Sequence, residues 1–506
     1  MEQILQGLIA VLTIKHLVLM AIGILLGMIF GAIPGLTPVL GMTLCLPLSF
    51  SMAPIAAMVF LLGIYCGGGF GGSITAILIG TPGTAQAAAT LLDGYPLAKG
   101  GKAYKVLMMA LTSSSIGGLI SAVSLLMFAP IIASFAMKFG PPEYFVMALF
   151  GLTIIAAISA ESIAKGLFMG ALGFLLAMVG MDNLTGVFRF TFDSIYLYNG
   201  FSFISIMMGV FALSKVLREI HEYYYQPRQE QALSQDEFIQ FEEGDGLERQ
   251  EVKKSLKTIL KGSGIGVLVG AIPAAGAEIA AFMSYNEAKR TAKDPESYGK
   301  GNLDGVAAAE SANNAVTGSA LIPMLTVGIP GSGGAAALMG ALTIQGLAPG
   351  PLLFRDYAFE MYAVMVGLLV INIMMYFQGR LLMKHFAKVA LVPKEIIVAA
   401  LVFLCAAGTY SVGRNIFNIY VLVVAGIVFY LFWRFGFPTM PIVLGLILGS
   451  VAEDNLRRAL VISDGSWKIF VTRPICLVFI LLSGIVVYSV IRQNRKKKTK
   501  EMKMAA

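Results

Sequence analysis

Two short segments with the pattern G-x-P-G interrupt apolar sequence, and they constrain the fold more than any other feature of the chain. The first is GTPGTAQAAAT, residues 80–90, and the second is GIPGSGGAAAL, residues 328–338. Proline has no N–H to donate and glycine loosens the backbone, so a helix that reaches either turn ends there and a new helix begins after it. The start of the new helix has unpaired N–H groups and the positive end of the helix dipole, which together favour an anion.

A purely structural role for these turns is the alternative. Glycine and proline are common in transmembrane helices, where neighbouring helices satisfy the backbone groups that a break releases. A single copy would favour that alternative. Two matched copies favour a transport site, because interrupted segments at corresponding positions of two halves are typical of secondary transporters.

The composition is that of a membrane protein. The chain has 506 residues, of which 57% are hydrophobic and 13% are charged, whereas a soluble domain carries about 25% charged residues. Apolar runs long enough to cross a bilayer recur along the chain, which predicts an all-α polytopic protein with roughly 11–14 membrane segments. The net charge of +8 comes from short loops and the tail RQNRKKKTK, where basic residues set the topology, so no nucleic-acid partner is expected.

The motifs of the first half return in the second half in the same order, which predicts an internal duplication. GAIPGLTP at 31–38 matches GAIPAAGAEIAAF from Gly270, GGGFGGS at 67–73 matches NNAVTGS at 313–319, and DGYPLAKG at 93–100 matches QGLAPG at 345–350. We therefore expect a first transmembrane repeat at 1–214, a polar linker at 215–257, a second repeat at 258–460, and an extra helix with a basic tail at 461–506.

Basic residues indicate that the two repeats are inverted. Lys99, Lys102 and Lys105 place the loop after the first turn in the cytoplasm, while the matching loop around Arg355 is poor in basic residues. The linker and the C-terminus are then also cytoplasmic. The basic loop 285–303 looks cytoplasmic as well, so either the segment 258–283 is re-entrant or the acids near this loop overrule its basic charges.

Inverted repeats with broken helices or re-entrant hairpins place a site near the middle of the membrane. We expect the turns to bind a carboxylate through their N–H groups and hydroxyls. The candidate substrate residues are Thr81, Pro82, Gly83, Thr84, Gly328, Pro330, Gly331, Ser332, Gly333, Pro34 and Gly35.

Polar side chains near the turns are candidates for a coupling ion, either Na⁺ or H⁺. Carbonyl groups at unwound helix ends, together with Asn, Ser and Thr oxygens, suit a dehydrated Na⁺. The candidates are Ser73, Thr75, Asn313, Asn314, Thr317 and Glu278. Ser and Thr hydroxyls can instead bond back to their own helix. For the other acid in this region, Glu310, we expect a position in contact with water.

No other cofactor or metal is expected, and no enzyme. The chain has no nucleophile–base set, phosphate-binding loop or paired metal ligands. A channel is the alternative transport class, but its signature would be rings of filter residues rather than matched broken helices.

The combined motifs resemble a known family. GAIPGLTP, GTPGTAQAAATLLDGYPLAKGGKA, ESANNA and GIPGSGGAAALMGAL, between about Gly31 and Leu353, are similar to the large membrane subunit of the tripartite tricarboxylate transporters. The resemblance implies a multi-pass carrier in the lipid of the bacterial inner membrane, coupled to an ion gradient. It implies a periplasmic solute-binding protein and a small four-helix membrane subunit as partners, and a citrate-like di- or tricarboxylate as substrate. A channel, or a carrier for another small organic anion, is the alternative.

Overall fold

The structure is a computed structural model that describes residues 2–159, 163–182, 185–225, 246–273, 275–389 and 392–488. Within these ranges the chain is almost entirely helical; the two strands, β1 (Gly180–Met181) and β2 (Phe188–Arg189), form one antiparallel pair. Six helices in the described part are long and apolar enough to cross a membrane, and shorter apolar helices accompany them. The prediction of an all-α polytopic membrane protein is confirmed. Residues 226–245 of the predicted linker and the basic tail at 489–506 lie outside the described ranges.

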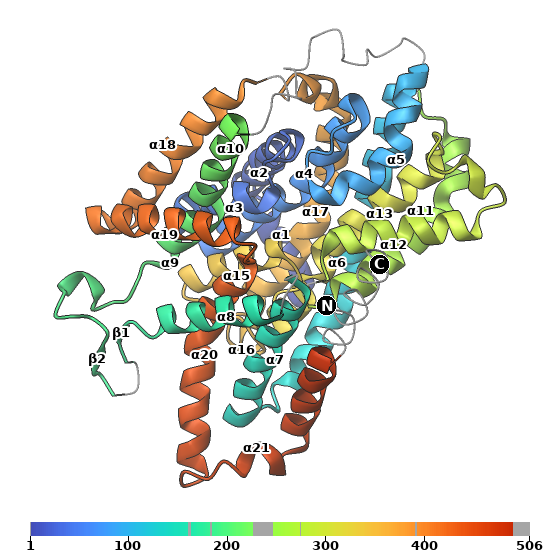
Figure 1. Cartoon of the computed structure of the whole chain (residues 1–506). Coiled ribbons are helices and arrows are strands. Elements are labelled where there is room, and N and C mark those ends of the chain that lie inside the picture. Colours follow the sequence, from blue (N-terminus) through green and yellow to red (C-terminus); the bar gives the residue numbers. More distant parts are fainter. Residues whose placement is uncertain are drawn as a thin grey trace, which may run out of the picture. The chain divides into compact units, whose positions relative to one another are not determined.

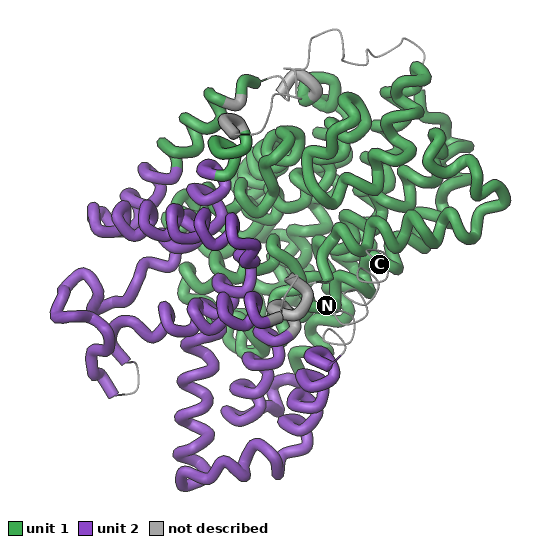
Figure 2. The backbone as a smooth tube through the Cα atoms, in the orientation of Figure 1, with its two compact units in different colours: residues 1–134, 218–404 green, residues 135–217, 405–506 purple. Residues whose placement is uncertain are grey.

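The helices form two compact units (Figure 2), and each unit takes residues from both halves of the sequence. Unit 1 comprises residues 1–134 and 218–404, and unit 2 comprises residues 135–217 and 405–506. The unit boundaries therefore do not follow the repeat boundaries. The two sets of boundaries differ because helices from one half of the sequence pack on helices from the other half.

Unit 1 carries both G-x-P-G turns. Its helices, labelled where there is room in Figure 1, are α1 (Glu2–Val11), α2 (Ile14–Ala32), α3 (Pro38–Phe50), α4 (Pro54–Ile79), η1 (Ala85–Ala87), α5 (Ala88–Leu97), η2 (Ala98–Lys102), α6 (Ala103–Ala136, with its last two residues in unit 2), α11 (Arg249–Gly270), α12 (Gly276–Thr291), η6 (Pro295–Ser297), α13 (Leu303–Ser319), α14 (Leu321–Val327), α15 (Gly333–Ile344), α16 (Leu352–Asp356) and α17 (Ala358–Val389).

Helices α2 and α4 pack closely because each presents glycines at a spacing of four residues. A Cβ atom added at Gly23 or Gly27 of α2 would meet a carbonyl oxygen of α4, and one added at Gly67 or Gly71 of α4 would meet a carbonyl oxygen of α2. Small residues on one face let two backbones approach, which is a common means of helix association in membranes. Helix α4 is enclosed by its neighbours, and 94% of its most apolar stretch of 18 residues is buried.

The two predicted repeats show similar local packing. Helix α11 packs along α13 as α2 packs along α4, and α12 packs on α13 as α3 packs on α4. The repeats also exchange contacts, since α3 lies against α15 while α12 lies against η1 and α5. The helix that follows each turn is therefore supported by the short helix of the other repeat.

Helices α11 and α12 form a pair whose polar ends lie together. Lys261 in the middle of α11 and Glu287 near the charged end of α12 form an ion pair of 2.5 Å, and the charged residues of α11 lie between its start and Lys261. The charged part of α11 and the charged end of α12 thus lie at the same end of this helix pair. This arrangement favours the re-entrant alternative for the segment 258–283.

Unit 2 contains the hairpin and the remaining helices. These are α7 (Pro141–Ser159), α8 (Ile163–Ala177), η3 (Ile195–Leu197), α9 (Phe203–Met207), η4 (Met208–Leu213), α19 (Ile416–Arg434), α20 (Met440–Ile462), α21 (Ile469–Thr472) and an apolar helix at Pro474–Tyr488, while α10 (Ser214–Tyr225) and α18 (Lys394–Gly413) run across the unit boundaries.

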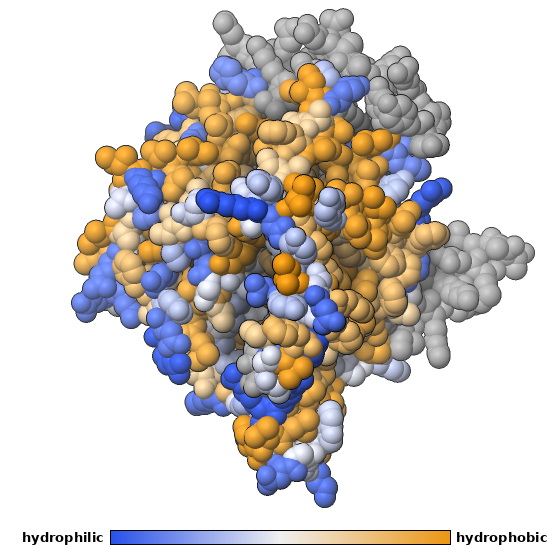
Figure 3. Space-filling view, turned by 90° about the vertical axis from the view of Figure 1, so that its left-hand side faces the viewer, coloured by the Kyte–Doolittle hydropathy of each residue, from blue (hydrophilic) through white to orange (hydrophobic). Residues whose placement is uncertain are grey.

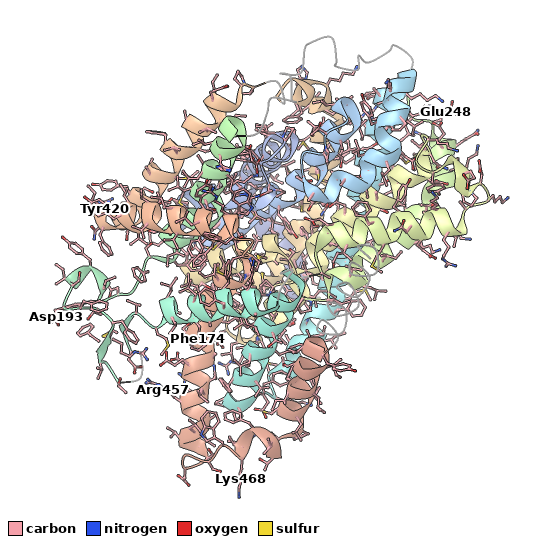
Figure 4. The ribbon with its side chains drawn as sticks, viewed as in Figure 1. Phe174, Asp193, Glu248, Tyr420, Arg457 and Lys468 are labelled. Atoms are coloured by element: carbon pink, nitrogen blue, oxygen red, sulfur yellow. The ribbon has the colours of Figure 1, made fainter. Side chains whose placement is uncertain are left out.

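Helices of the two halves interlock in unit 2 as well. Helix α20 of the second half packs on α7 and α8 of the first, and α9 and η4 of the first half pack on α19 of the second. An ion cluster connects α20 to the hairpin, because Arg457 pairs with Asp182 at 2.5 Å and with Glu453 at 3.1 Å. Figure 4 labels Arg457 close to the base of the hairpin.

The surface fits a lipid environment. Figure 3 shows hydrophobic side chains spread over much of the face in view. Leu381, Phe403 and Val424, on three of the helices that could cross a membrane, are among the exposed large hydrophobic residues. A surface of this kind would be unstable in water.

Candidate substrate and ion site

Both G-x-P-G turns break a helix at the same position and with the same backbone geometry. Helix α4 ends at Ile79, followed by Gly80 with φ 75° and ψ 14°, and α14 ends at Val327, followed by Gly328 with φ 75° and ψ 22°. Glycine adopts this left-handed conformation at little cost, and it is a common way for helices to end. The predicted helix breaks are therefore present.

The new helices begin where the sequence predicts, but their first residues are bonded differently. Ser332 is the N-cap of α15, and its Oγ accepts a hydrogen bond of 3.2 Å from the Ala335 N–H. Thr84 is the N-cap of η1, but its buried Oγ1 has no partner within the described residues. At the second turn the Ser332 hydroxyl is therefore used to cap its own helix, whereas at the first turn the Thr84 hydroxyl has no hydrogen bond to the described residues.

The last glycine of each turn packs against the backbone of its own repeat. A Cβ atom at Gly83 would meet the carbonyl oxygen of Gly31, and one at Gly331 would lie 2.6 Å from the carbonyl oxygen of Gly270. Gly31 and Gly270 are the matching first residues of the two GAIP motifs. These positions need glycine for close packing, since the positive φ of each turn falls at its first glycine.

One stripe of α4 contacts both turns. Tyr65, Gly69, Gly72 and Ser73 lie on one face of the helix, because they are spaced by four, seven and eight residues. The Tyr65 hydroxyl lies 2.7 Å from Ser332 Oγ at the second turn. A Cβ atom at Gly72 would meet the Thr84 side chain at the first turn. The two residues of α4 that contact the helix starts are therefore separated by roughly 10 Å along its axis, given a rise of about 1.5 Å per residue.

Helix α13 crosses the same stripe in the opposite direction. Asn313 Nδ2 donates to the Gly69 carbonyl oxygen at 3.1 Å, and Ser73 Oγ donates to Glu310 Oε1 at 2.5 Å. Residue numbers in these contacts increase along α4 and decrease along α13, so the two helices run antiparallel. Because α4 and α13 carry the matching GGGFGGS and NNAVTGS motifs, this direction is the one that inverted repeats require.

Two asparagines of α13 lie against Gly69 of α4 in this crossing. The buried Oδ1 atoms of Asn313 and Asn314 have no hydrogen-bond donor within the described part of the chain. A Cβ atom at Gly69 would meet Asn314 Oδ1 and would lie 3.5 Å from Gln86 Nε2. Buried oxygens without a hydrogen-bond donor are uncommon, which makes these two atoms candidate ligands for an ion, a substrate or a water molecule.

Glu310 is fully buried beside these asparagines. Its carboxylate accepts hydrogen bonds from Ser73 of α4, from Thr90 of α5 and from Ser114 of α6, the last at 2.7 Å. The expectation that Glu310 lies in contact with water was wrong. A lone acid among small residues gave no indication of which helix face the other repeat would cover.

The other predicted ion-site residues are distributed differently. Thr75 Oγ1 bonds to the Gly72 carbonyl oxygen and Thr317 Oγ1 to the Asn314 carbonyl oxygen. Both therefore follow the alternative in which a hydroxyl bonds to its own helix. Glu278 is exposed on α12.

Among the predicted substrate residues, Gly83, Thr84, Gly328, Pro330, Gly331 and Ser332 are buried, whereas Thr81, Pro82 and Gly333 are half-buried. Pro34 and Gly35 form the turn between α2 and α3. Gly35 has a φ of 91°, and a Cβ atom there would lie 2.6 Å from Glu219 Oε1 of α10.

The sequence did not predict four residues that lie at the site, namely Tyr65, Gln86, Thr90 and Ser114. Spacing on α4 could have suggested Tyr65, because it lies eight residues before Ser73 and hence on the same face. The other three follow the first turn on η1, α5 and α6, and their side chains come to the site only because these helices pack against α13.

A second buried carboxylate, that of Asp93, holds the neighbouring loop. Asp93 Oδ1 accepts from the N–H groups of Gly299, Gly301 and Asn302 at 2.8–2.9 Å, and Tyr285 donates its hydroxyl proton to Oδ2 at 2.9 Å. This carboxylate of the first repeat thereby anchors the start of α13. Asp93 therefore has a structural role in this region, because both of its carboxylate oxygens accept hydrogen bonds from the protein.

Paired broken helices on a buried crossing of antiparallel helices define a polytopic membrane protein with an organisation that is typical of transporters. The chain belongs to the tripartite tricarboxylate transporter TctA family, whose sequence model matches residues 17–444. It is therefore a subunit of a transport system that has further subunits. Family membership indicates transport rather than catalysis.

Two proteins of Agrobacterium vitis are similar to the chain. One, "Uncharacterized 52.8 kDa protein in TAR-I ttuC' 3'region", is 34% identical over 484 residues, which cover 94% of this chain and 95% of that protein. The other, "Uncharacterized protein in TAR-II ttuC' 3'region", is 34% identical over 230 residues, or 44% of this chain and 95% of that protein. No solved structure matches the chain.

Proposed function

We propose that the chain is the carrier subunit of a system that takes up a di- or tricarboxylate, such as a citrate-like acid, by alternating access. A gradient of Na⁺ or H⁺ drives the uptake. The observation that carries the proposal is the stripe of α4, because one buried face contacts both helix starts and the polar groups of α13. In a coupled carrier, one conformational change must alter both the substrate site and the ion site, so the residues of the two sites have to lie on elements that contact one another.

The substrate proposal rests on the two helix starts at Thr84 and Ser332. Each start presents N–H groups and the positive end of a helix dipole, which favour a carboxylate. Two starts on one side of α4 can hold two carboxylate groups of one molecule. The half-buried residues Thr81, Pro82 and Gly333 provide the approach to these starts.

Alternating access follows from the relation between the repeats at 1–214 and 258–460. Two equivalent elements of opposite direction can exchange roles, which gives an outward-open and an inward-open state of similar energy. The crossed contacts of α3 with α15 and of α12 with α5 support this, because each repeat holds the helix that moves with the other repeat's turn.

The partners and the membrane are proposed from the family. A periplasmic solute-binding protein delivers the substrate, a small four-helix membrane subunit accompanies this chain, and the complex lies in the inner membrane with the linker 215–257 and the C-terminus in the cytoplasm. Since capture occurs on the binding protein, the carrier itself needs only weak affinity for free substrate.

Uptake measurements test this proposal. Cells that lack carboxylate uptake would express the chain together with a candidate binding protein and a candidate small subunit from the same organism. Radiolabelled citrate and a panel of dicarboxylates would be supplied under imposed Na⁺ and pH gradients. We expect saturable uptake that requires the binding protein and one of the gradients. Omission of the binding protein is the matched control.

Two results would contradict the proposal. Robust uptake by this chain alone would remove the tripartite mechanism. Currents that do not saturate, recorded from purified protein in bilayers, would favour the channel alternative, and saturable transport of a different small organic anion would favour the alternative carrier.

A further inference from the structure

Glu310 is a buried carboxylate that is held by hydroxyl groups of three separate helices. Ser73 on α4, Thr90 on α5 and Ser114 on α6 each donate to it. All four side chains are buried, Ser73, Thr90, Ser114 and Glu310 each with 0% exposure. These hydroxyl donors stabilise a negative charge on the carboxylate, whereas its complete burial opposes that charge.

The hydroxyl groups leave the charge of Glu310 uncompensated. Within the described residues, no lysine, arginine or histidine forms an ion pair with it. Buried charges in proteins are paired or coordinate a cation, since an isolated charge is too costly to keep ionised in an apolar interior. The nearby acid Asp93 does not change this, because its oxygens are engaged by backbone N–H groups and Tyr285.

Residues with unused oxygen acceptors come from the same stretch of α13 and from the turn beside Gly72 of α4. Asn313 follows Glu310 by one helical turn on the same face of α13, and its Nδ2 contacts α4 one turn from Ser73. Its Oδ1 is buried and lacks a donor in the described part of the protein, as do Asn314 Oδ1 and Thr84 Oγ1. One negative charge and several unpaired neutral oxygens are the ligands that a hard monovalent cation prefers.

We propose that Glu310 is the charged ligand of an Na⁺ site, in which Ser73, Asn313 and neighbouring oxygens complete the coordination. The ion is the coupling ion of the carrier, so this assignment rests on the proposed function and deepens it. A proton on Glu310 would neutralise the charge, but it would supply a donor to one acceptor and leave the amide oxygens unpaired. An Na⁺ ion engages several oxygens at once and leaves the site neutral.

The site joins the two repeats, which explains how an ion would act on transport. Glu310 and Asn313 come from the second repeat, whereas Ser73, Thr90 and Ser114 come from the first. A bound ion therefore favours the state in which these helices are together. Because α4 also contacts both turns, that state is the one in which the substrate groups are assembled.

The test is the thermal unfolding of the full chain, purified with any subunit that accompanies it, in a series of NaCl concentrations. Choline chloride keeps the ionic strength constant, and the series is repeated at two pH values. For the wild type we expect a saturable rise of the unfolding temperature with Na⁺, because a ligand that binds only the folded state stabilises it. Glu310→Gln, which keeps the shape but removes the charge, should abolish this rise or raise its Na⁺ midpoint by about tenfold or more.

Glu143→Gln is the matched control, because Glu143 is a buried acid in unit 2 that pairs with Arg473. Its unfolding temperature can fall, but its Na⁺ midpoint should equal that of the wild type. Asn313→Ala and Ser73→Ala should raise the midpoint by smaller factors than Glu310→Gln. These two variants carry the test if Glu310→Gln does not accumulate.

Several outcomes would overturn the site. They are equal stability of the wild type in Na⁺ and choline, an unchanged Na⁺ midpoint in Glu310→Gln, or unchanged midpoints in both Asn313→Ala and Ser73→Ala. Stabilisation by lower pH alone, without any effect of Na⁺, would replace the Na⁺ site with a proton site. Wild type that binds Na⁺ but takes up no carboxylate with its partners would instead contradict the proposed function and leave the ion site intact.

Discussion

The hydroxyl of Tyr65 lies 2.7 Å from Ser332 Oγ, although 267 positions of the chain separate the two residues. The contact connects the middle of α4 in the first repeat to the N-cap of α15 in the second. Both atoms are buried, so the hydrogen bond forms where water does not compete with it. The second turn is therefore positioned by a helix of the other repeat.

Removal of the Tyr65 hydroxyl should loosen this connection. Tyr65→Phe keeps the ring, which packs where a Cβ atom of Gly334 would lie, and loses one hydrogen bond. We expect the free energy of unfolding to fall by about 1 kcal/mol and the apparent affinity for substrate to weaken, because the start of α15 is less restrained. Thermal unfolding and concentration-dependent uptake would measure the two effects.

The same contact can be isolated with a double-mutant cycle. Ser332→Ala also removes the N-cap bond to Ala335, so it should cost more than Tyr65→Phe. The combination should cost less than the sum of the two, with a coupling of roughly 0.5–3 kcal/mol. Strict additivity would show that the two side chains do not interact.

Side chains at Gly83 and Gly331 should disturb packing. A Cβ atom at Gly331 would lie 2.6 Å from the Gly270 carbonyl oxygen, and one at Gly83 would meet the Gly31 carbonyl oxygen. Gly331→Ala and Gly83→Ala should therefore lower the unfolding temperature, at a cost of about 1–3 kcal/mol. Gly264→Ala is the control, since nothing lies within 4 Å of a Cβ atom there. If Gly331→Ala has the stability of the wild type, the close packing at Gly331 is contradicted. Gly331 would then again be a candidate for substrate binding rather than for packing.

Thr84 offers a cleaner test of the first turn. Its hydroxyl is buried without a partner in the described residues, so Thr84→Ala breaks no hydrogen bond among them and costs only the packing of the buried methyl group. If the hydroxyl binds substrate or ion, affinity should fall about ten- to a hundredfold, the value of a hydrogen bond to a charged group. Thr326→Ala is the matched control, because that buried hydroxyl bonds to the Ile322 carbonyl oxygen of its own helix. Uptake by Thr84→Ala with wild-type dependence on substrate and ion would exclude Thr84 from the site.

Cysteine labelling should establish the orientation. The four native cysteines are buried, so they add little background. Cysteines introduced at Glu230 and Lys498, which lie outside the described residues, should react only when reagent reaches the cytoplasm. Phe192→Cys, at a position 86% exposed in the connection between α8 and α9, should react from outside intact cells, because one span separates it from the linker. External labelling at Glu230 would refute the inverted arrangement.

Local chemistry explains why the two helix breaks could be predicted. Proline and glycine end a helix through their own backbone properties, whatever surrounds them, and the breaks occur at Gly80 and Gly328 as expected. The all-α membrane class was predictable for a similar reason. Apolar length is a property of each segment by itself, and only helices can satisfy their backbone groups within one segment in lipid.

The composition of the site depended on contacts between distant segments. Ser73, Thr84, Asn313, Asn314 and Ser332 were predicted, because each lies in or near a motif that is visible in the sequence. Their division into roles was not visible, since Ser332 caps its own helix while Thr84 has a hydroxyl to offer.

Glu310 shows what only the tertiary structure decided. It lies in VAAAESANNAVTGS, where small residues surround it on all sides, so the helical period marks no buried face. The crossing of α13 with α4, α5 and α6 determines that this carboxylate faces Ser73 and Ser114 rather than water. Sequence determined where the helices end, because that depends on the backbone of neighbouring residues. Tertiary structure determined which polar groups meet, because that depends on how helices more than 200 residues apart pack against one another.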